Sequence, residues 1–168
     1  MDSFKVFSQS DVLALTSQRE GEEKLGERVL VVSNLNEIGN SSAKFVLLGI
    51  PEDIGVRANL GIGGAKTALQ ATLKAILNIQ SNSFLNGEEI LVLGHFEIGE
   101  PTDQSLMGLR EKVSEIDELI YPVIQQIIAA HKIPIVIGGG HNNCYPIIKG
   151  TSLALNTKVN AVNIDAHT

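Results

Sequence analysis

The sequence has no tryptophan, one cysteine and only 4% aromatic residues among its 168 positions. A single cysteine cannot form a disulfide within the chain, which excludes a disulfide-stabilised extracellular framework. No apolar stretch approaches the roughly 18 to 20 residues that a membrane-spanning helix needs. The residues from Met1 to Lys5 lack the basic region and apolar run of a secretory signal. These absences predict a reducing, cytoplasmic location.

Positive charge is also scarce, because 13 Lys and Arg residues stand against 19 Asp and Glu residues, for a net charge of −6. A nucleic acid or an anionic membrane would require a basic face, so neither is expected as a partner. Hydrophobic residues make up 43% of the chain and charged residues 19%, a composition that argues against disorder. A chain of this length can build a domain with a proper hydrophobic core.

The patterning divides the chain into two regions. Residues 1–43 are polar and weakly patterned, and could form an N-terminal arm, a lid, a sheet edge or an interface. Ser10 and Asp11 could cap a short helix in this region. From residue 44 onward, short apolar runs alternate with helical periods, which predicts an α/β domain over 44–168.

The apolar runs and helical periods of the second region predict an ordered series of elements. Strands are expected at 45–50, 90–93, 133–137 and 159–164, and helices at 65–77, 105–132 and 145–155. Pro122 should kink the longest helix or divide it into two abutting helices. Strands and helices that alternate with short links indicate a parallel sheet with helices on both faces.

Two of the predicted strands end in residues that can bind a metal. Asp165 and His167 close the last strand, and alternate strand residues share a face, so both side chains can aim at one point. His141 follows the preceding strand, directly after three glycines at 138–140. Neighbouring parallel strands lie about 4.8 Å apart, and ligands gather at their carboxyl ends. A carboxylate with two imidazoles suits a divalent transition metal.

The segment around His141 also has simpler interpretations. The three glycines could make a tight turn or cradle a phosphate, although the Gly-x-Gly-x-x-Gly spacing and a basic partner are absent. Asn143 is a weak candidate for substrate contact, and it or Asn142 could instead cap the following helix. Cys144 has no evident base beside it, so a small buried side chain is the better interpretation.

The Gly-Gly-Gly-His141-Asn-Asn loop and the Asp165-Ala-His167-Thr strand end resemble the first two metal motifs of the ureohydrolase superfamily. This superfamily comprises arginases, agmatinases and formimidoylglutamases. The glycine-containing segment 55–65 is similar to the loop that follows the first strand in that family. The resemblance covers about 44–168 and implies an arginase-like three-layer sandwich, incomplete in this chain. The form of the loop is closest to formimidoylglutamase-like members.

The resemblance implies a hydrolase with two manganese ions. His141 would ligate one ion, His167 the other, and Asp165 would bridge them. Such a pair lowers the pKa of a water, which can then attack the guanidino or formimidoyl carbon of a small amino-acid derivative. Relatives in this superfamily commonly form homo-oligomers, so a homo-oligomer is expected here too.

The family motif continues with an aspartate directly after the position of Thr168, and with an aspartate pair on a later strand. This sequence contains neither. We therefore expect the N-terminal portion of a larger enzyme, with partial or no manganese bound and little hydrolysis by this chain alone. The alternative is a non-catalytic ureohydrolase-like module that recruits a partner through an open sheet edge.

Overall fold

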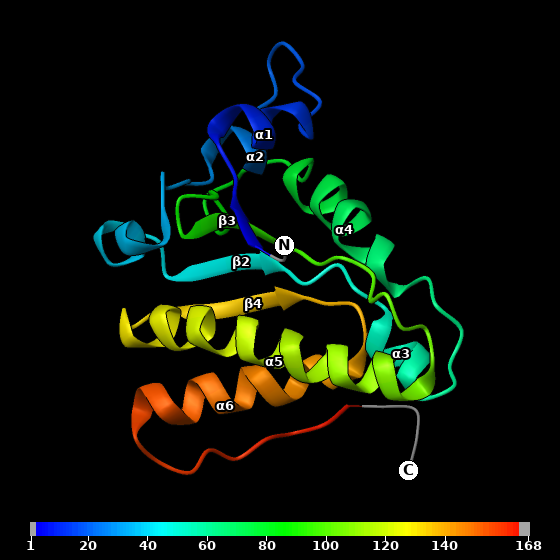
Figure 1. Ribbon diagram of the computed structural model, residues 1–168. Helices are drawn as coiled ribbons and strands as arrows, with labels where there is room; N and C mark the ends of the chain where they lie inside the picture. The colour runs from blue at the N-terminus through cyan, green and yellow to red at the C-terminus, as the bar shows by residue number, and fades with distance from the viewer. Residues whose placement is uncertain (1–2, 165–168) are drawn as a thin grey trace.

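The computed structural model describes residues 3–164, which form a four-stranded sheet flanked by helices (Figure 1). The strand order is β1-β3-β2-β4. β2 (Phe45–Gly49) pairs in parallel with both β3 (Ile90–Glu97) and β4 (Ile133–Ile137), while β1 (Ser3–Val6) runs antiparallel to β3. The predicted α/β class with a largely parallel sheet is therefore confirmed.

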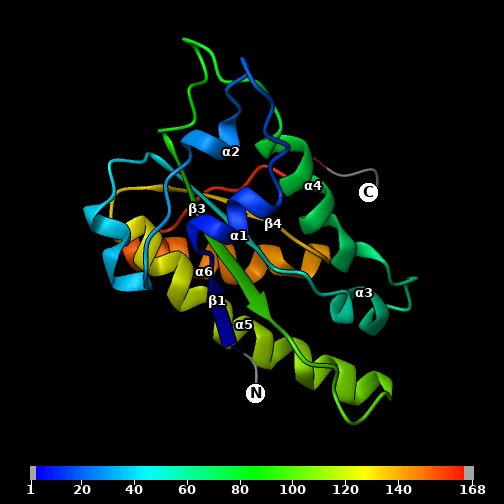
Figure 2. The same cartoon turned by 90° about the horizontal axis from the view of Figure 1, so that it is seen from above.

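Successive residues of the central strands build two separate cores, one on each face of the sheet. Val46 and Leu48 of β2 belong to one buried cluster, which includes the apolar face of α5 (Leu106–Ala129). Leu47 between them belongs to the other cluster, with Leu73 of α4 (Ala68–Leu77). α6 (Cys144–Leu155) packs against α5 as a second helix on the first face. Figure 1 shows α4 on one side of the sheet and α5 and α6 on the other, and Figure 2 shows the same elements from above. The expected helices on both faces are present.

The longest helix, α5, continues through Pro122. Proline lacks the N–H that would bond to the carbonyl of Glu118, so one helical hydrogen bond is lost. Ile120 and Ile124 on either side of the proline are fully buried in the core cluster, so both turns are anchored by the same packing. The expectation of two abutting helices is therefore wrong.

The N-terminal region packs onto the sheet rather than standing apart from it. β1 lies at the sheet edge, and the rings of Phe4 and Phe96 meet edge to face with centroids 4.8 Å apart. α1 (Gln9–Ala14) begins after Ser8, which forms a capping box with Asp11. The predicted short helix and the part of Asp11 in its cap are confirmed, whereas the N-cap is Ser8 and not Ser10. α2 (Leu25–Arg28) and the 3-10 helix η1 (Leu35–Asn40) complete this region.

The strand predicted at 159–164 is not formed. This segment follows α6 without regular structure, and the side chains of Val162 and Ile164 are 90% and 97% exposed. A strand that is apolar on both faces needs a pairing edge and cover on each side. Among the described residues, nothing covers the outer edge of β4, where Ile133 and Ile135 remain 47% and 41% exposed.

No helix in the part of the chain that the structure describes is both long and apolar enough to cross a lipid bilayer.

Candidate functional site

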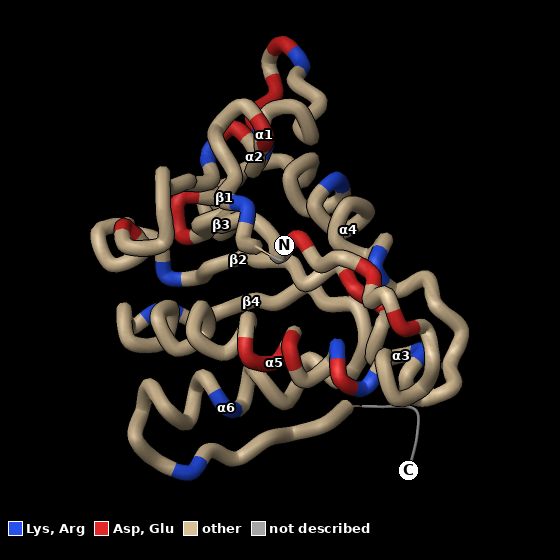
Figure 3. The backbone as a smooth tube through the Cα atoms, viewed as in Figure 1, with Lys and Arg blue, Asp and Glu red and all other residues tan. Residues whose placement is uncertain are grey.

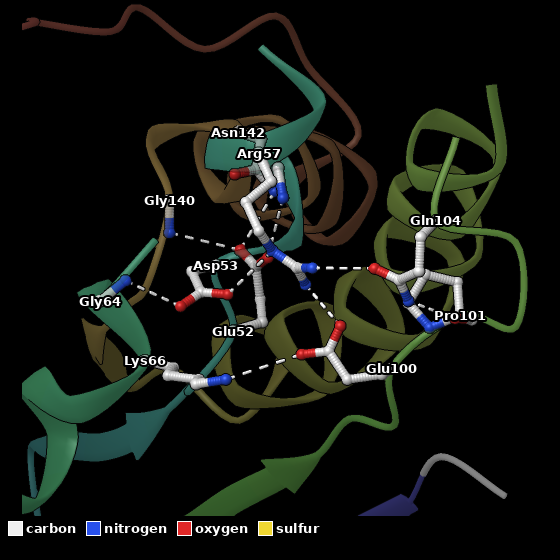
Figure 4. Close-up of polar contacts among 11 residues, drawn as sticks. Glu52, Asp53, Arg57, Gly64, Lys66, Glu100, Pro101, Gln104, Gly140 and Asn142 are labelled. Atoms are coloured by element: carbon white, nitrogen blue, oxygen red, sulfur yellow. Dashed lines mark hydrogen bonds and ion pairs between the residues drawn. The ribbon is translucent and has the colours of Figure 1, made fainter. Parts of the chain in front are cut away.

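The segments that follow β2 and β4 come together at the carboxyl edge of the sheet (Figure 4). Glu52 and Asp53 follow β2 and precede the short helix α3 (Ile54–Ala58). The triple glycine follows β4 and leads into the 3-10 helix η3 (His141–Asn143), which runs directly into α6. Because β2 and β4 are adjacent and parallel, the segments that follow them emerge at the same edge of the sheet, although they lie far apart in the sequence.

Glu52 is the centre of this junction and is only 2% exposed. Its Oε1 accepts hydrogen bonds from Asn143 Nδ2 at 2.7 Å, Asn142 Nδ2 at 3.2 Å and the Gly140 N–H at 3.3 Å. Its Oε2 accepts from the Gly55 N–H at 3.1 Å. These neutral donors hold one carboxylate beneath the loop that carries His141.

Sequence reasoning missed Glu52. One signal was present, because an acidic residue directly after a buried strand and Pro51 lies at the sheet edge where ligands gather.

Two glycines of the loop lie where a side chain would clash, Gly139 against Glu52 and Gly140 against Asn142. A Cβ at Gly139 would lie 1.5 Å from the backbone oxygen of Glu52, and a Cβ at Gly140 would lie 2.1 Å from Asn142 Oδ1. A side chain at Gly139 would require movement of the backbone, and one at Gly140 would displace the Asn142 side chain that donates to Glu52. The predicted close approach of the glycine backbone is confirmed, and its immediate partner is the segment after β2.

His141 is exposed and lies beside a hollow of about 810 Å³. The walls of this hollow come from α3, the loop that follows it, α5 and the start of α6. Its lining residues are Gly55, Val56, Asn59, Gly61, Val113, Asp117, His141, Asn142, Cys144 and Tyr145.

The other two predicted metal ligands, Asp165 and His167, lie outside the described residues. Within residues 3–164, no group of three or more His, Cys, Asp or Glu side chains is arranged to hold a metal ion. The structure therefore shows the surroundings of His141 and does not show the meeting of the three predicted ligands.

The residues next to His141 differ in their surroundings. Asn143 is 3% exposed, and its amide donates to Gly140 O at 3.1 Å as well as to Glu52. It occupies the N-cap position of α6, yet its side chain makes no capping hydrogen bond, so the predicted capping role is wrong. Its role in substrate contact stays a prediction. Cys144 is exposed, contrary to the buried side chain expected, because it lies at the edge of the hollow.

Asp53 fixes the adjacent loop through a second network. Its carboxylate is 4% exposed, accepts from the Gly64 N–H at 2.8 Å and lies 3.3 Å from Arg57 Nε. Arg57 also donates to Gln104 Oε1 at 3.1 Å and pairs with Glu100 (Figure 4). The hydrogen bond to Glu100 raises the pKa of the Arg57 guanidinium. The network ties the loop after α3 to the segment after β3, so one wall of the hollow is held rigidly.

Comparison with known proteins agrees with this architecture. Residues 43–168 match the family model described as Arginase family. Formimidoylglutamase of Geobacillus sp. is 32% identical over 125 residues, which cover 73% of this chain and 35% of that protein. Formimidoylglutamase of Geobacillus thermodenitrificans is 33% identical over 122 residues, covering 71% and 34%. The enzyme of the same name from Chromobacterium violaceum is 28% identical over 131 residues, covering 76% and 38%.

The chain thus spans about a third of the length of these curated relatives. All three relatives are named formimidoylglutamase, the subgroup that the Gly-Gly-Gly-His-Asn-Asn loop resembles most. The matched region contains the whole parallel part of the sheet and the loop of His141. On these grounds, this chain belongs to the arginase family of ureohydrolase-type hydrolases.

Proposed function

We propose that His141, Asp165 and His167 contribute to a binuclear manganese centre that hydrolyses a C–N bond in a guanidino or formimidoyl substrate. The observation that carries this proposal is the family match, which runs through all three residues. The similarity to formimidoylglutamases favours a formimidoyl amino acid as the substrate. We also propose that 44–168 belongs to the hydrolase domain and that 1–43 is an N-terminal addition to it, whose strand β1 joins the edge of the sheet.

The surroundings of His141 fit a cation site. A neutral imidazole offers a ring nitrogen to a metal, and the His141 side chain is exposed at the carboxyl edge of the sheet. Glu52 fixes the loop from below and adds a buried negative charge, which favours a cation nearby. When bound, a manganese pair would supply a water of lowered pKa for the attack on carbon.

His141 would hold one ion, His167 the other and Asp165 both, as the family resemblance implies. These residues provide two imidazoles and one carboxylate, whereas the family motif adds further aspartates. Fewer carboxylates leave less negative charge to balance two divalent cations. We therefore expect weak manganese binding and slow hydrolysis by this chain alone.

Titration with Mn²⁺ tests the proposal, with the electron paramagnetic resonance signal of free Mn²⁺ as the readout. We expect the wild-type chain to bind manganese and His141→Ala to raise the Kd at least about 10-fold, as is typical when a ligand shell is disturbed. His131→Asn is the control, because His131 lies at the opposite end of β4 and asparagine tolerates its φ of 57°.

Equal manganese affinity in the wild type and His141→Ala would contradict the proposal, as would a wild-type chain that binds no manganese. Formamide release from N-formimidoyl-glutamate, measured beside urea release from arginine and agmatine, then ranks the substrates.

A further inference from the structure

A second hollow, of about 350 Å³, lies where the N-terminal region packs against α4. It shares none of its described lining residues with the hollow beside His141. One of its walls is apolar and consists of Phe7, Leu15, Pro51, Leu69 and Leu73. Phe7, Leu69 and Leu73 belong to the core cluster on this face of the sheet, so packing holds the wall in place.

The remaining described lining residues are polar, and two of them are lysines. Lys5 of β1 is the direct cross-strand partner of His95 of β3, so both side chains lie on the same face of the sheet. Lys66 lies in the 3-10 helix η2 (Ala65–Thr67), directly before α4. Figure 3 shows basic residues both on β1 and at the start of α4. Ammonium groups from two separate elements thus reach one hollow.

His95 adds a ring but no charge to this hollow at neutral pH. Burial lowers its pKa and the charge of Lys5 lowers it further, whereas Glu97 and Asp11 oppose the shift. Its ring packs against that of Phe7, with centroids 5.2 Å apart. The imidazole therefore extends the apolar wall, and the lysines carry the positive charge.

Acids near the hollow match these lysines poorly. Lys5 is exposed and forms no ion pair within residues 3–164. Lys66 Nζ lies 3.6 Å from Glu100 Oε1, and about half of each side chain is exposed, so this ion pair is weak. Asp11 is the one acid among the described lining residues, and its Oδ2 already accepts from the Ser8 N–H at 2.8 Å and the Ser8 hydroxyl at 2.6 Å. Positive charge is therefore in excess here, although the whole chain has a net charge of −6.

We propose that this hollow binds a small monocarboxylate with an apolar body. The carboxylate accepts hydrogen bonds from the ammonium groups of Lys5 and Lys66, which are stronger than bonds between neutral groups. The body covers the apolar wall and removes its surface from water. A volume of about 350 Å³ lies at the lower end of the range for small-ligand sites, so the body has the size of a short branched chain.

The charges and the wall together select this class of ligand. A cation would meet two like charges, and a small inorganic anion would leave the apolar wall in contact with water. The inference goes beyond the function proposed above and involves no metal. Part of the lining comes from the N-terminal region and part from 44–168, so a bound carboxylate holds the two regions together.

Titration of the whole chain with 4-methylpentanoate at pH 7.5, followed by ¹H–¹⁵N NMR, tests the inference. We expect saturable shifts of the amides that line the hollow, with a Kd on the order of 1 mM. The amide analogue 4-methylpentanamide lacks the charge, 4-methylpentylamine reverses it, and acetate lacks the apolar body. Each of these three compounds should bind at least about 10-fold more weakly.

Two substitutions test the lysines directly. Lys5→Met and Lys66→Met each remove a charge and keep most of the side-chain length, and the double variant should raise the Kd about 10-fold, equivalent to about 1.4 kcal/mol. Lys74→Met is the matched control, because it makes the same change on α4 at an exposed residue that does not line the hollow. All three positions are exposed, so each variant should fold as the wild type does.

Equal affinity of the wild type and the double variant for 4-methylpentanoate would overturn the inference. Acetate or 4-methylpentylamine binding as tightly as 4-methylpentanoate would overturn it as well, because the hollow would then select neither an apolar body nor a negative charge. Shifts that do not saturate, or that lie only outside the hollow, have the same consequence.

Discussion

Two partly or fully buried acids near His141 show how differently a carboxylate can be accommodated. Glu52 is 2% exposed and accepts hydrogen bonds from two side-chain amides and two backbone N–H groups. Asp117 has an enclosed oxygen that accepts none, and its pKa is raised to about 6 by burial. The first acid stabilises the local structure, whereas the second stores a destabilising charge, as acids at binding sites often do.

Asp117 should make the stability of the protein depend on pH. Its folded-state pKa of about 6 lies above the unfolded value of 3.8, so the folded chain binds this proton more tightly. Its contribution to stability is therefore complete below about pH 4 and is lost as the pH rises through 6. Asp117→Asn should raise the free energy of unfolding at pH 7.5 by about 1–2 kcal/mol, a figure reduced for partial solvent exposure.

Urea denaturation at pH 4, 6 and 7.5 measures this effect, with Glu115→Gln as the control. The gain from Asp117→Asn should be mostly lost at pH 4, where Asp117 is protonated in the folded state and partly protonated in the unfolded state. A gain that is the same at every pH would show that the charge is not its cause.

At the scale of the elements, Glu52 connects β2, α3 and η3. The helix α3 has only five residues and η3 only three, so neither is stable by itself. The Glu52 carboxylate accepts from Gly55 in α3 and from both asparagines of η3. One side chain thus joins the two short elements at the carboxyl edge of the sheet.

Glu52→Ala should therefore destabilise the protein strongly. It leaves buried donors of Gly140, Asn142 and Asn143 with fewer partners, at a cost of about 2–4 kcal/mol in the free energy of unfolding. Urea denaturation followed by circular dichroism measures the change. Glu20→Ala, at an exposed position in a loop, is the control and should change the stability by less than about 0.5 kcal/mol. Similar losses in both variants would contradict the role of Glu52.

Element prediction from the sequence was most successful where burial decides the pattern. The apolar runs at 45–50 and 133–137 form β2 and β4 nearly as expected. β2 is buried on both faces, and β4 pairs with it. The run at 159–164 has the same composition and forms no strand, because no described edge pairs with it. The four residues of β1 were too few to show a pattern, and pairing with β3 alone defines them.

At the scale of the whole molecule, the sheet ends in two edge strands of different character. β1 occupies the first edge and shields β3. β4 lies at the other, where Ile133 and Ile135 expose 47% and 41% of their surface. An open apolar edge favours pairing with another chain. The expected homo-oligomer and the alternative of a partner-binding module would both use this edge.

Ile135→Lys should reduce self-association of the chain, because a charged side chain on an edge strand opposes pairing with another strand. Sedimentation velocity at about 10 to 100 µM is the measurement. Ile62→Lys is the control, since Ile62 is 95% exposed in the loop after α3, away from this edge. The role of β4 fails if both variants change the sedimentation coefficient equally, or if neither does.

The sequence alone determined the fold class and the family. Alternating apolar runs and helical periods require burial on two faces, and the glycine–histidine loop is specific enough to identify its relatives. His141 could also be placed at the sheet edge, because residues that follow parallel strands must emerge there.

Only the tertiary structure showed that Glu52 lies beneath the His141 loop and that Asp117 lies unpaired in the adjacent hollow. These arrangements bring together positions about 90 and 24 residues apart in the chain, counted from Glu52 and Asp117 to His141. No local pattern encodes such contacts, because they depend on how β2, α3, α5 and α6 pack together. From the sequence, His141 could be identified as a candidate site residue. The packing of the helices on the sheet determines that Glu52 lies beneath its loop and that Asp117 Oδ1 accepts no hydrogen bond from the described residues.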